Sequence, residues 1–379
     1  MNVIKAVLGA GAFALPWAFA NGGLVLASST VLASLAVCVW SVHMLVKARQ
    51  FLPAAKAEKI DTYTELAAAA ISEKGGLATE LMVLVCCFGI ASAYMVFVAD
   101  TLATVITPAV LGVGPVGSAE LLIYLLPLWV GLAWIKEMSG LSLISLLGNV
   151  SCVGGMAVVA QFATQMPSQL AALPTWNPAT FPQWFGSVAF LFFTHFSLPG
   201  IESAMADKSK FSLASFKGFA FCAALAISFG VMGAIAFGPA VGSNVITDLQ
   251  GTGVVLAVKL LLCFNLLATF PVVCRTAFLT IEKFAKMGGF TMGTWSSRAV
   301  RTAYTVAAGL TAVAIPNFGR LLGVVGGFCC SMLTCFFPAM MYIWGAKAAG
   351  RELTALESAG AWGTMVLGVV LGVLSVFFA

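Results

Sequence analysis

Long apolar runs alternate with short polar connections along almost the entire chain. A helix needs about 20 predominantly apolar residues to cross a bilayer, and about eleven runs approach or exceed that length. They cover approximately residues 2–21, 24–46, 77–104, 121–135, 141–165, 184–206, 214–238, 254–282, 299–315, 318–345 and 360–378. The pattern predicts an all-α, polytopic membrane protein with about eleven transmembrane helices in one transmembrane domain, residues 1–379.

The composition supports this class and excludes others. Of the 379 residues, 61% are hydrophobic and 9% are charged, whereas soluble domains carry roughly 25% charged residues. The ten cysteines all fall in apolar runs, so we expect neither a disulfide framework nor a zinc site. The sequence also lacks an HExxH motif, a carboxylate pair within one run and a nucleophile–histidine arrangement. We therefore expect no enzyme activity, no cofactor and no metal site.

The basic residues indicate how the chain is threaded through the membrane. Fifteen of the 19 Lys and Arg residues lie in alternate connections, and the opposite connections hold none. The fifteen are Lys47, Arg49, Lys56, Lys59, Lys74, Lys136, Lys208, Lys210, Lys217, Lys283, Lys286, Arg298, Arg301, Lys347 and Arg351. The positive-inside rule then predicts a cytosolic N-terminus and a C-terminus on the other side. The net charge of +5 reflects this topology, and we expect no nucleic-acid partner.

Two connections have their own local signals. Residues 166–183 contain four prolines and no charge, which predicts an ordered cap near the membrane surface. In the connection 47–76, Thr62 and Glu65 precede a run of alanines. This spacing is typical of a capping box at the start of a short helix.

The first apolar run contains features that interrupt a helix. Gly9-Ala10-Gly11 is followed by Leu15-Pro16; closely spaced glycines weaken a helix, and proline removes a backbone hydrogen bond. Irregular backbone at membrane depth is tolerated where protein or a water-filled cavity satisfies the freed groups. The alternative interpretation is a Gly/Ala stripe that packs against a neighbouring helix.

A second interruption lies in the run 184–206. Its centre reads Thr194-His195-Phe196-Ser197-Leu198-Pro199-Gly200, and Glu202 follows. The two interrupted runs are five runs apart, so they enter the membrane from opposite sides. This predicts a 5+5 inverted repeat with broken helices 1 and 6, whose half-helix ends face a substrate and a coupling ion at the midplane. Repeat one covers about 1–165, repeat two about 184–345, and an extra helix about 360–379.

Three motifs resemble the amino acid/auxin permease family. Gly9-Ala-Gly11 with Leu15-Pro16 resembles its first helix, and Leu198-Pro199-Gly-Ile-Glu202 followed by Met205-Ala-Asp-Lys-Ser-Lys-Phe211 its sixth. The third motif is Ile315-Pro316-Asn317-Phe318, then Val325-Gly326-Gly327 and Phe337-Pro338-Ala339. The resemblance implies a LeuT-type fold of the amino acid-polyamine-organocation superfamily that carries amino acids, driven by protons or sodium.

The resemblance and the two breaks together suggest a set of candidate residues. For substrate binding these are Gly9, Ala10, Gly11, Tyr94, Phe193, Thr194, His195, Ser197 and Asn265. For coupling and gating they are Lys5, Glu202, Thr269 and Asp100. A lone histidine is also often a satisfied packing residue, and polar groups such as Tyr94, Asn265 and Thr269 also serve as interhelical contacts. Lys259, Arg275 and Arg320 fall near run ends, where we expect them to reach the membrane surface.

Lys5 and Glu202 are expected to meet at the cytosolic gate. Related sodium-driven carriers tend to place an asparagine near the position of Lys5, so an ammonium there would replace the ion. This favours a proton over sodium as the coupling ion. Lys5 also has a simpler interpretation, in which it only reaches the cytosolic surface.

The leading prediction is secondary active transport of amino acids, neutral and proton-coupled, by alternating access. The alternatives are an amino-acid sensor with the same fold, or a carrier for auxin or a polyamine. The expected partners are the amino-acid substrate and the lipid bilayer. The sequence leaves open the oligomeric state and whether the membrane is the plasma membrane or a vacuolar or lysosomal one.

Overall fold

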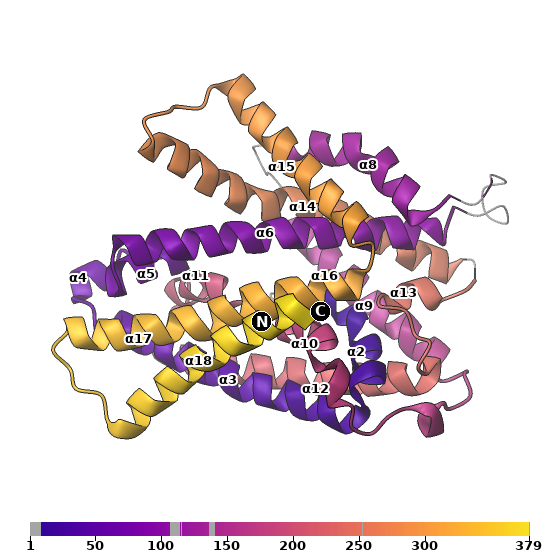
Figure 1. The fold of residues 1–379 in the computed structure, drawn as a ribbon, viewed down its shortest axis with the longest axis horizontal. Helices are drawn as coiled ribbons and strands as arrows, with labels where there is room; N and C mark the ends of the chain where they lie inside the picture. The colour runs from indigo at the N-terminus through magenta and orange to yellow at the C-terminus, as the bar shows by residue number, and fades with distance from the viewer. Residues whose placement is uncertain (1–8, 107–113, 115, 136–140, 252, 379) are drawn as a thin grey trace.

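The computed structural model in Figure 1 describes residues 9–106, 114, 116–135, 141–251 and 253–378. Every regular element in these ranges is helical. The α-helices are α2 (Leu15–Gly22), α3 (Leu24–Gln50), α4 (Ala54–Ala57), α5 (Tyr63–Ala70), α6 (Glu73–Ala103), α8 (Ser118–Ala133), α9 (Leu141–Ala163), α10 (Phe181–Leu191), α11 (Leu198–Ser203), α12 (Phe211–Phe237), α13 (Val245–Asp248), α14 (Val254–Met287), α15 (Thr294–Ala314), α16 (Phe318–Val324), α17 (Phe337–Ala348) and α18 (Ala355–Phe378).

Shorter elements join several of these helices. The 3-10 turns are Ala10–Ala14, Leu170–Ala172, Pro178–Thr180, His195–Ser197 and Lys208–Lys210. Val325–Cys330 and Met332–Phe336 are π-helical. We call residues 325–336 the π segment; it joins α16 to α17 within one long helical run.

Helical elements lie in each of the predicted apolar runs. Seven of them, within the described ranges, are long and apolar enough to cross a membrane. They are Leu24–Gln50, Glu73–Ala103, Pro178–Ser203, Lys208–Phe237, Val254–Met287, Phe318–Ala348 and Ala355–Phe378. The prediction of an all-α, polytopic membrane protein is confirmed, while the number of spans and the inverted repeat stay predictions.

The helical bundle has two distinct ends. Figure 1 shows α4, the α14–α15 connection and the α17–α18 connection together at the left. Basic residues lie in or next to these segments, among them Lys56, Lys283, Lys286, Lys347 and Arg351. We call this the basic end. The opposite end, where α13 lies at the right of Figure 1, is called the neutral end.

An ordered cap covers the neutral end, as predicted for the connection 166–183. The Leu24 N–H donates to the Pro174 carbonyl at 3.2 Å, and the Asn177 N–H donates to the Gly22 carbonyl at 2.9 Å. Gly23 has φ +86° and lies against the backbone of this cap. A side chain at Gly23 would be strained and would collide with the cap.

Glycines bring α10 close to α16 and the π segment. A Cβ at Gly186 would overlap the carbonyl of Gly323, and a Cβ at Gly326 would overlap the carbonyl of Gly186. Within membranes, helix association depends on close van der Waals packing, which small residues permit. The second broken run is therefore fixed on one side by α16 and the π segment.

Candidate functional site

The backbone before Leu15 is not α-helical. Gly9 is extended (φ −149°, ψ −172°), and Ala10–Ala14 form a 3-10 turn. Pro16 lies in the first turn of α2, where its missing N–H removes no intrahelical bond. The part of the run before Gly9, including Lys5, lies outside the described residues.

The two glycines of this segment have different surroundings. A Cβ at Gly9 would meet no atom of the described residues within 4 Å, whereas a Cβ at Gly11 would lie 2.7 Å from Phe190 Cδ1. Ala10 between them is 6% exposed. Gly9 therefore borders open space, as a ligand floor requires, while Gly11 serves the close packing of this segment against α10.

The predicted break in the run 184–206 is confirmed. α10 ends at Leu191, α11 begins at Leu198, and the residues between them leave the α-helix. Ser197 donates both its N–H (2.9 Å) and its hydroxyl (2.8 Å) to the Thr194 carbonyl. Ser197 therefore stabilises the break itself.

Thr194 carries a free polar group at this break. Its hydroxyl oxygen is buried and has no hydrogen-bond partner among the described residues. Unpaired buried hydroxyls are costly and usually bind water or a ligand. Beside it, Phe193 packs on Phe196 with ring centroids 5.1 Å apart, and Phe196 is 40% exposed, so the break is not sealed on every side.

His195 is fully buried, and both of its ring nitrogens face other helices. Nδ1 lies 3.2 Å from the Thr334 hydroxyl of the π segment, and Nε2 lies 3.8 Å from the Cys38 sulfur of α3. The ring also stacks parallel to Phe219 of α12. In this conformation His195 connects the π segment, α3 and α12 to the break. This is the packing role that the sequence offered as the alternative to substrate binding.

Asn265, Thr269 and Tyr94 lie on the helices around the first break. A Cβ at Gly148 of α9 would overlap Asn265 Oδ1, so the Asn265 side chain reaches the α9 backbone. The Thr269 hydroxyl donates to the Asn265 carbonyl at 2.7 Å. Tyr94 is partly buried against the main hydrophobic core. Asn265 thus contacts a neighbouring helix, α9, whereas the Thr269–Asn265 hydrogen bond lies within α14.

Aromatic side chains fill the neutral half above the first break. Phe13 packs on Phe97 and Phe229, and Phe97 packs on Phe318, with ring centroids 5.1–6.3 Å apart. All four are at most 3% exposed. Nearer the end, a Cβ at Gly319 would lie 2.8 Å from Ser243 and 2.9 Å from Trp17. The neutral end is closed in this structure.

Polar residues connect α13 to the neutral ends of α6 and α14. The buried Lys259 ammonium donates to the Thr104 hydroxyl and to the Leu249 carbonyl, each at 2.8 Å. The expectation that Lys259 reaches the membrane surface is therefore wrong, because these acceptors hold it inside.

Burial raises the pKa of Asp248, while the Gly242 N–H and Lys259 partly oppose the shift. Asp100 lies half-buried at this end with Ser118 as its hydrogen-bond partner.

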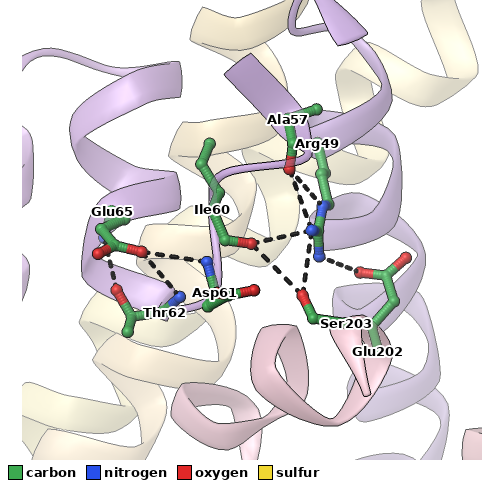
Figure 2. Close-up of polar contacts among 8 residues, drawn as sticks. All are labelled: Arg49, Ala57, Ile60, Asp61, Thr62, Glu65, Glu202 and Ser203. Carbon is green, nitrogen blue, oxygen red and sulfur yellow. Dashed lines mark hydrogen bonds and ion pairs between the residues drawn. The ribbon is translucent and has the colours of Figure 1, made fainter. Parts of the chain in front are cut away.

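Figure 2 shows a buried ion pair at the basic end. Arg49 Nη1 at the end of α3 lies 3.3 Å from Glu202 Oε2 of α11, and their side chains are 8% and 11% exposed. The same guanidinium donates to the carbonyls of Ala57 (3.0 Å) and Ile60 (2.8 Å) and to the Ser203 hydroxyl (3.1 Å). Arg49 therefore joins α3, the connection 51–62 and α11 of the second broken run.

In the sequence, Glu202 is predicted to pair with a basic residue, but the predicted partner is Lys5 rather than Arg49. Arg49 appeared there only as one of many basic residues that indicate topology. No local signal singled it out, because Lys47 lies in the same last turn of α3. The pairing of Lys5 with Glu202 concerns a residue outside the described ranges and stays a prediction.

The whole chain, residues 1–379, matches the family described as transmembrane amino acid transporter protein. The chain belongs to this family. The amino acid transporter AVT3C of Arabidopsis thaliana is similar to it, with 29% identity over 396 residues, 98% of this chain and 87% of that relative. The proton-coupled amino acid transporter-like protein pathetic of Drosophila melanogaster is 25% identical, covering 90% of this chain and 75% of that protein.

Solved structures support the fold. MhsT, crystallised in complex with L-phenylalanine, matches with a TM-score of 0.61 at 12% identity, over 100% of this chain and 97% of that chain. A manganese transporter of Eremococcus coleocola matches with a TM-score of 0.54 at 12% identity, over 98% of this chain and 84% of that chain. The family member described here has a LeuT-type fold, as the resemblance implied.

The family assignment settles the general activity. This integral, multi-pass membrane protein of the amino acid transporter family moves amino acids across a membrane and is not an enzyme. A cavity of about 380 Å³ between α3, α10, the π segment and α18 contains none of the predicted substrate residues. At the second break, by contrast, the buried Thr194 hydroxyl has no hydrogen-bond partner among the described residues.

Proposed function

We propose that this transporter carries neutral amino acids by alternating access, with the substrate held between the two breaks. The main observation is the unpartnered, buried hydroxyl of Thr194. The first broken segment meets α10 of the second run through Gly11 and Phe190. The substrate carboxylate binds backbone donors near Gly9, and its ammonium binds polar groups near Thr194.

The residues at the breaks favour a neutral side chain on the substrate. Residues 9–14 and 192–198 contain no Asp, Glu, Lys or Arg, so no fixed charge is there to pair with a charged side chain. A polyamine would need carboxylates at this place. The neighbouring Phe13, Phe190 and Phe193 instead offer apolar surface.

Protons are the proposed coupling ion. Glu202 is the buried carboxylate closest in sequence to a break, and its ion pair with Arg49 joins α11 to α3. Protonation of Glu202 removes the charge that attracts Arg49 and releases this contact. Lys5, if it lies near the first break, disfavours a sodium ion there. We further propose that the basic end faces the cytosol.

Uptake by purified protein in proteoliposomes tests this proposal. A panel of neutral, acidic and basic amino acids is offered under an imposed pH gradient or an imposed sodium gradient. We expect accumulation of neutral amino acids driven by the pH gradient and unchanged by sodium. Preferred uptake of a charged amino acid would refute the substrate class, and stimulation by the sodium gradient would refute proton coupling.

The Thr194→Val variant tests the binding site. It retains the shape of the side chain and removes the unpartnered hydroxyl. We expect the apparent KM to rise about tenfold, the effect of losing roughly one hydrogen bond to a charged group. Ser187→Ala is the matched control, because the Ser187 hydroxyl of α10 is also buried without a partner but precedes the break. An unchanged KM in Thr194→Val would move the ammonium site elsewhere.

A further inference from the structure

Pro338 leaves the carbonyl groups of the π segment short of helical donors. In an α-helix residue 338 would donate its N–H to the carbonyl of residue 334, and in a π-helix to that of residue 333. Proline has no N–H and can serve neither. In a membrane such carbonyls must find other partners.

Two hydroxyl groups from other helices supply these partners. The Tyr63 hydroxyl of α5 donates to the Leu333 carbonyl at 2.7 Å, and the Ser41 hydroxyl of α3 donates to the Thr334 carbonyl. Tyr63 is 1% exposed and Ser41 0%. Burial raises the pKa of Tyr63 well above its usual value, so the hydroxyl keeps its proton and remains a donor.

The π segment is also the point at which this long helical run can change its bend. π-helical turns and prolines are where helices kink, because the regular hydrogen-bond ladder is interrupted there. On one side of the π segment, α16 begins with Phe318 and Gly319, which close the neutral end. On the other side, α17 packs on α3 and α5.

Tyr63 connects this bending point to the basic-end network. α5 begins at Tyr63, with Thr62 as its N-cap and Glu65 completing the capping box, as the sequence predicted. Figure 2 shows this N-terminus directly after Ile60, whose carbonyl binds Arg49. The same short connection therefore contacts the Arg49–Glu202 pair and holds the π segment.

We propose that Tyr63 is a positioning residue whose bond to the Leu333 carbonyl, left free by Pro338, fixes the bend of the π segment and so stabilises the conformation closed at the neutral end. Ser41 supports the same bend through Thr334. Opening the neutral end moves α16 and breaks these bonds. The inference rests on the proposed alternating access of this chain.

Labelling of the reconstituted full-length protein tests the role of Tyr63 without any substrate. Ser243→Cys is the reporter, because residue 243 is partly buried against Gly319 at the closed neutral end. A membrane-impermeant thiol reagent reacts with it faster in the open state, so a change in the rate follows the population of that state. Ala179→Cys, at an exposed position of the same end, gives the reference rate, and labelling of the parent protein gives the background.

We expect Tyr63→Phe to raise the labelling rate of Ser243→Cys about fivefold, the factor that corresponds to one hydrogen bond of about 1 kcal/mol. Tyr304→Phe is the matched control. The Tyr304 hydroxyl is buried and has no hydrogen-bond partner among the described residues, so its removal should leave the rate unchanged. Ser41→Ala should raise the rate in the same direction as Tyr63→Phe, and it serves as the test if Tyr63→Phe does not fold.

An equal rate in Tyr63→Phe, Ser41→Ala and Tyr304→Phe would overturn the proposal, as would slower labelling in Tyr63→Phe. A lower unfolding temperature of Tyr63→Phe with unchanged labelling would also overturn it, because that result indicates a structural role alone. Failure to transport any neutral amino acid would refute the proposed substrate and leave the labelling result standing.

Discussion

Substitutions at Arg49 and Glu202 test whether their ion pair stabilises the basic end of the bundle. Removing Glu202 by Glu202→Ala leaves a guanidinium that is 8% exposed without its opposite charge. An unpaired buried charge costs roughly 3–5 kcal/mol. We expect a value of about 3 kcal/mol, at the lower end, because the Ala57 and Ile60 carbonyls and the Ser203 hydroxyl still accept hydrogen bonds from Arg49.

The Coulomb attraction between Arg49 and Glu202 is larger than the net contribution of the pair to the free energy of unfolding. At 3.3 Å and an effective dielectric constant near 20, the Coulomb energy is about 5 kcal/mol. Desolvation of both groups offsets most of it, so replacing both partners together is often nearly neutral. The double variant Arg49→Met with Glu202→Ala should therefore be more stable than Glu202→Ala alone.

Thermal unfolding of the purified protein in detergent measures this order. We expect the lowest midpoint for Glu202→Ala, a higher one for Glu202→Gln, which keeps an acceptor oxygen, and a value near the parent for Ser203→Ala, which removes one of several acceptors. The double variant should recover part of the loss. If the double variant is as unstable as the two single variants added together, the two side chains do not interact, and the assignment of Glu202 as the partner of Arg49 fails.

Three further predictions concern packing, topology and pH. Gly186→Ala should destabilise the protein by about 1–3 kcal/mol, since the added Cβ would overlap the Gly323 carbonyl; Gly131→Ala, where nothing lies within 4 Å, should be neutral or slightly stabilising in the same unfolding assay. Cysteines at Ala179 and at Lys56 should label from opposite sides of the membrane, the first from outside intact cells or from the lumen; labelling from the same side would refute the threading inferred from the basic residues. Burial raises the pKa of Asp248 above 3.8, its value in the unfolded chain, so the contribution of Asp248 to the free energy of unfolding falls as the pH rises above 3.8 and through the higher folded pKa. Asp248→Asn should lack this fall, and equal slopes of unfolding midpoint against pH in the two proteins above pH 3.8 would contradict the prediction.

The class of the protein and much of its local structure could be predicted from the order of the residues alone. Hydrophobic run length decides whether a segment can cross a bilayer, so the all-helical membrane architecture followed from the apolar runs. The break around Thr194–Pro199 and the start of α5 at Tyr63 followed equally directly. Proline, glycine and capping residues act on their own backbone within one helical turn, and such effects need no knowledge of distant contacts.

Contacts between residues far apart in the chain could not be predicted in this way, because they depend on how the helices pack. The partner of Glu202 is Arg49, 153 positions away in the chain, and nothing in the local pattern distinguished this arginine from the other basic residues near it. His195 could equally have faced a substrate, but its ring nitrogens meet Thr334 and Cys38 because α3 and the π segment pack on the break.

The π segment shows the same division within one helix. Pro338 was visible in the sequence, and it removes a backbone donor wherever the chain folds. Which groups replace that donor depends on which helices pack there, and the answer, Tyr63 and Ser41, lies 270 and 293 positions away from the carbonyls that they bind. The local sequence therefore explains why these carbonyls lack helical donors. The packing of the bundle determines which groups bind them, because a hydrogen bond in the membrane interior requires a donor brought within about 3 Å by packing.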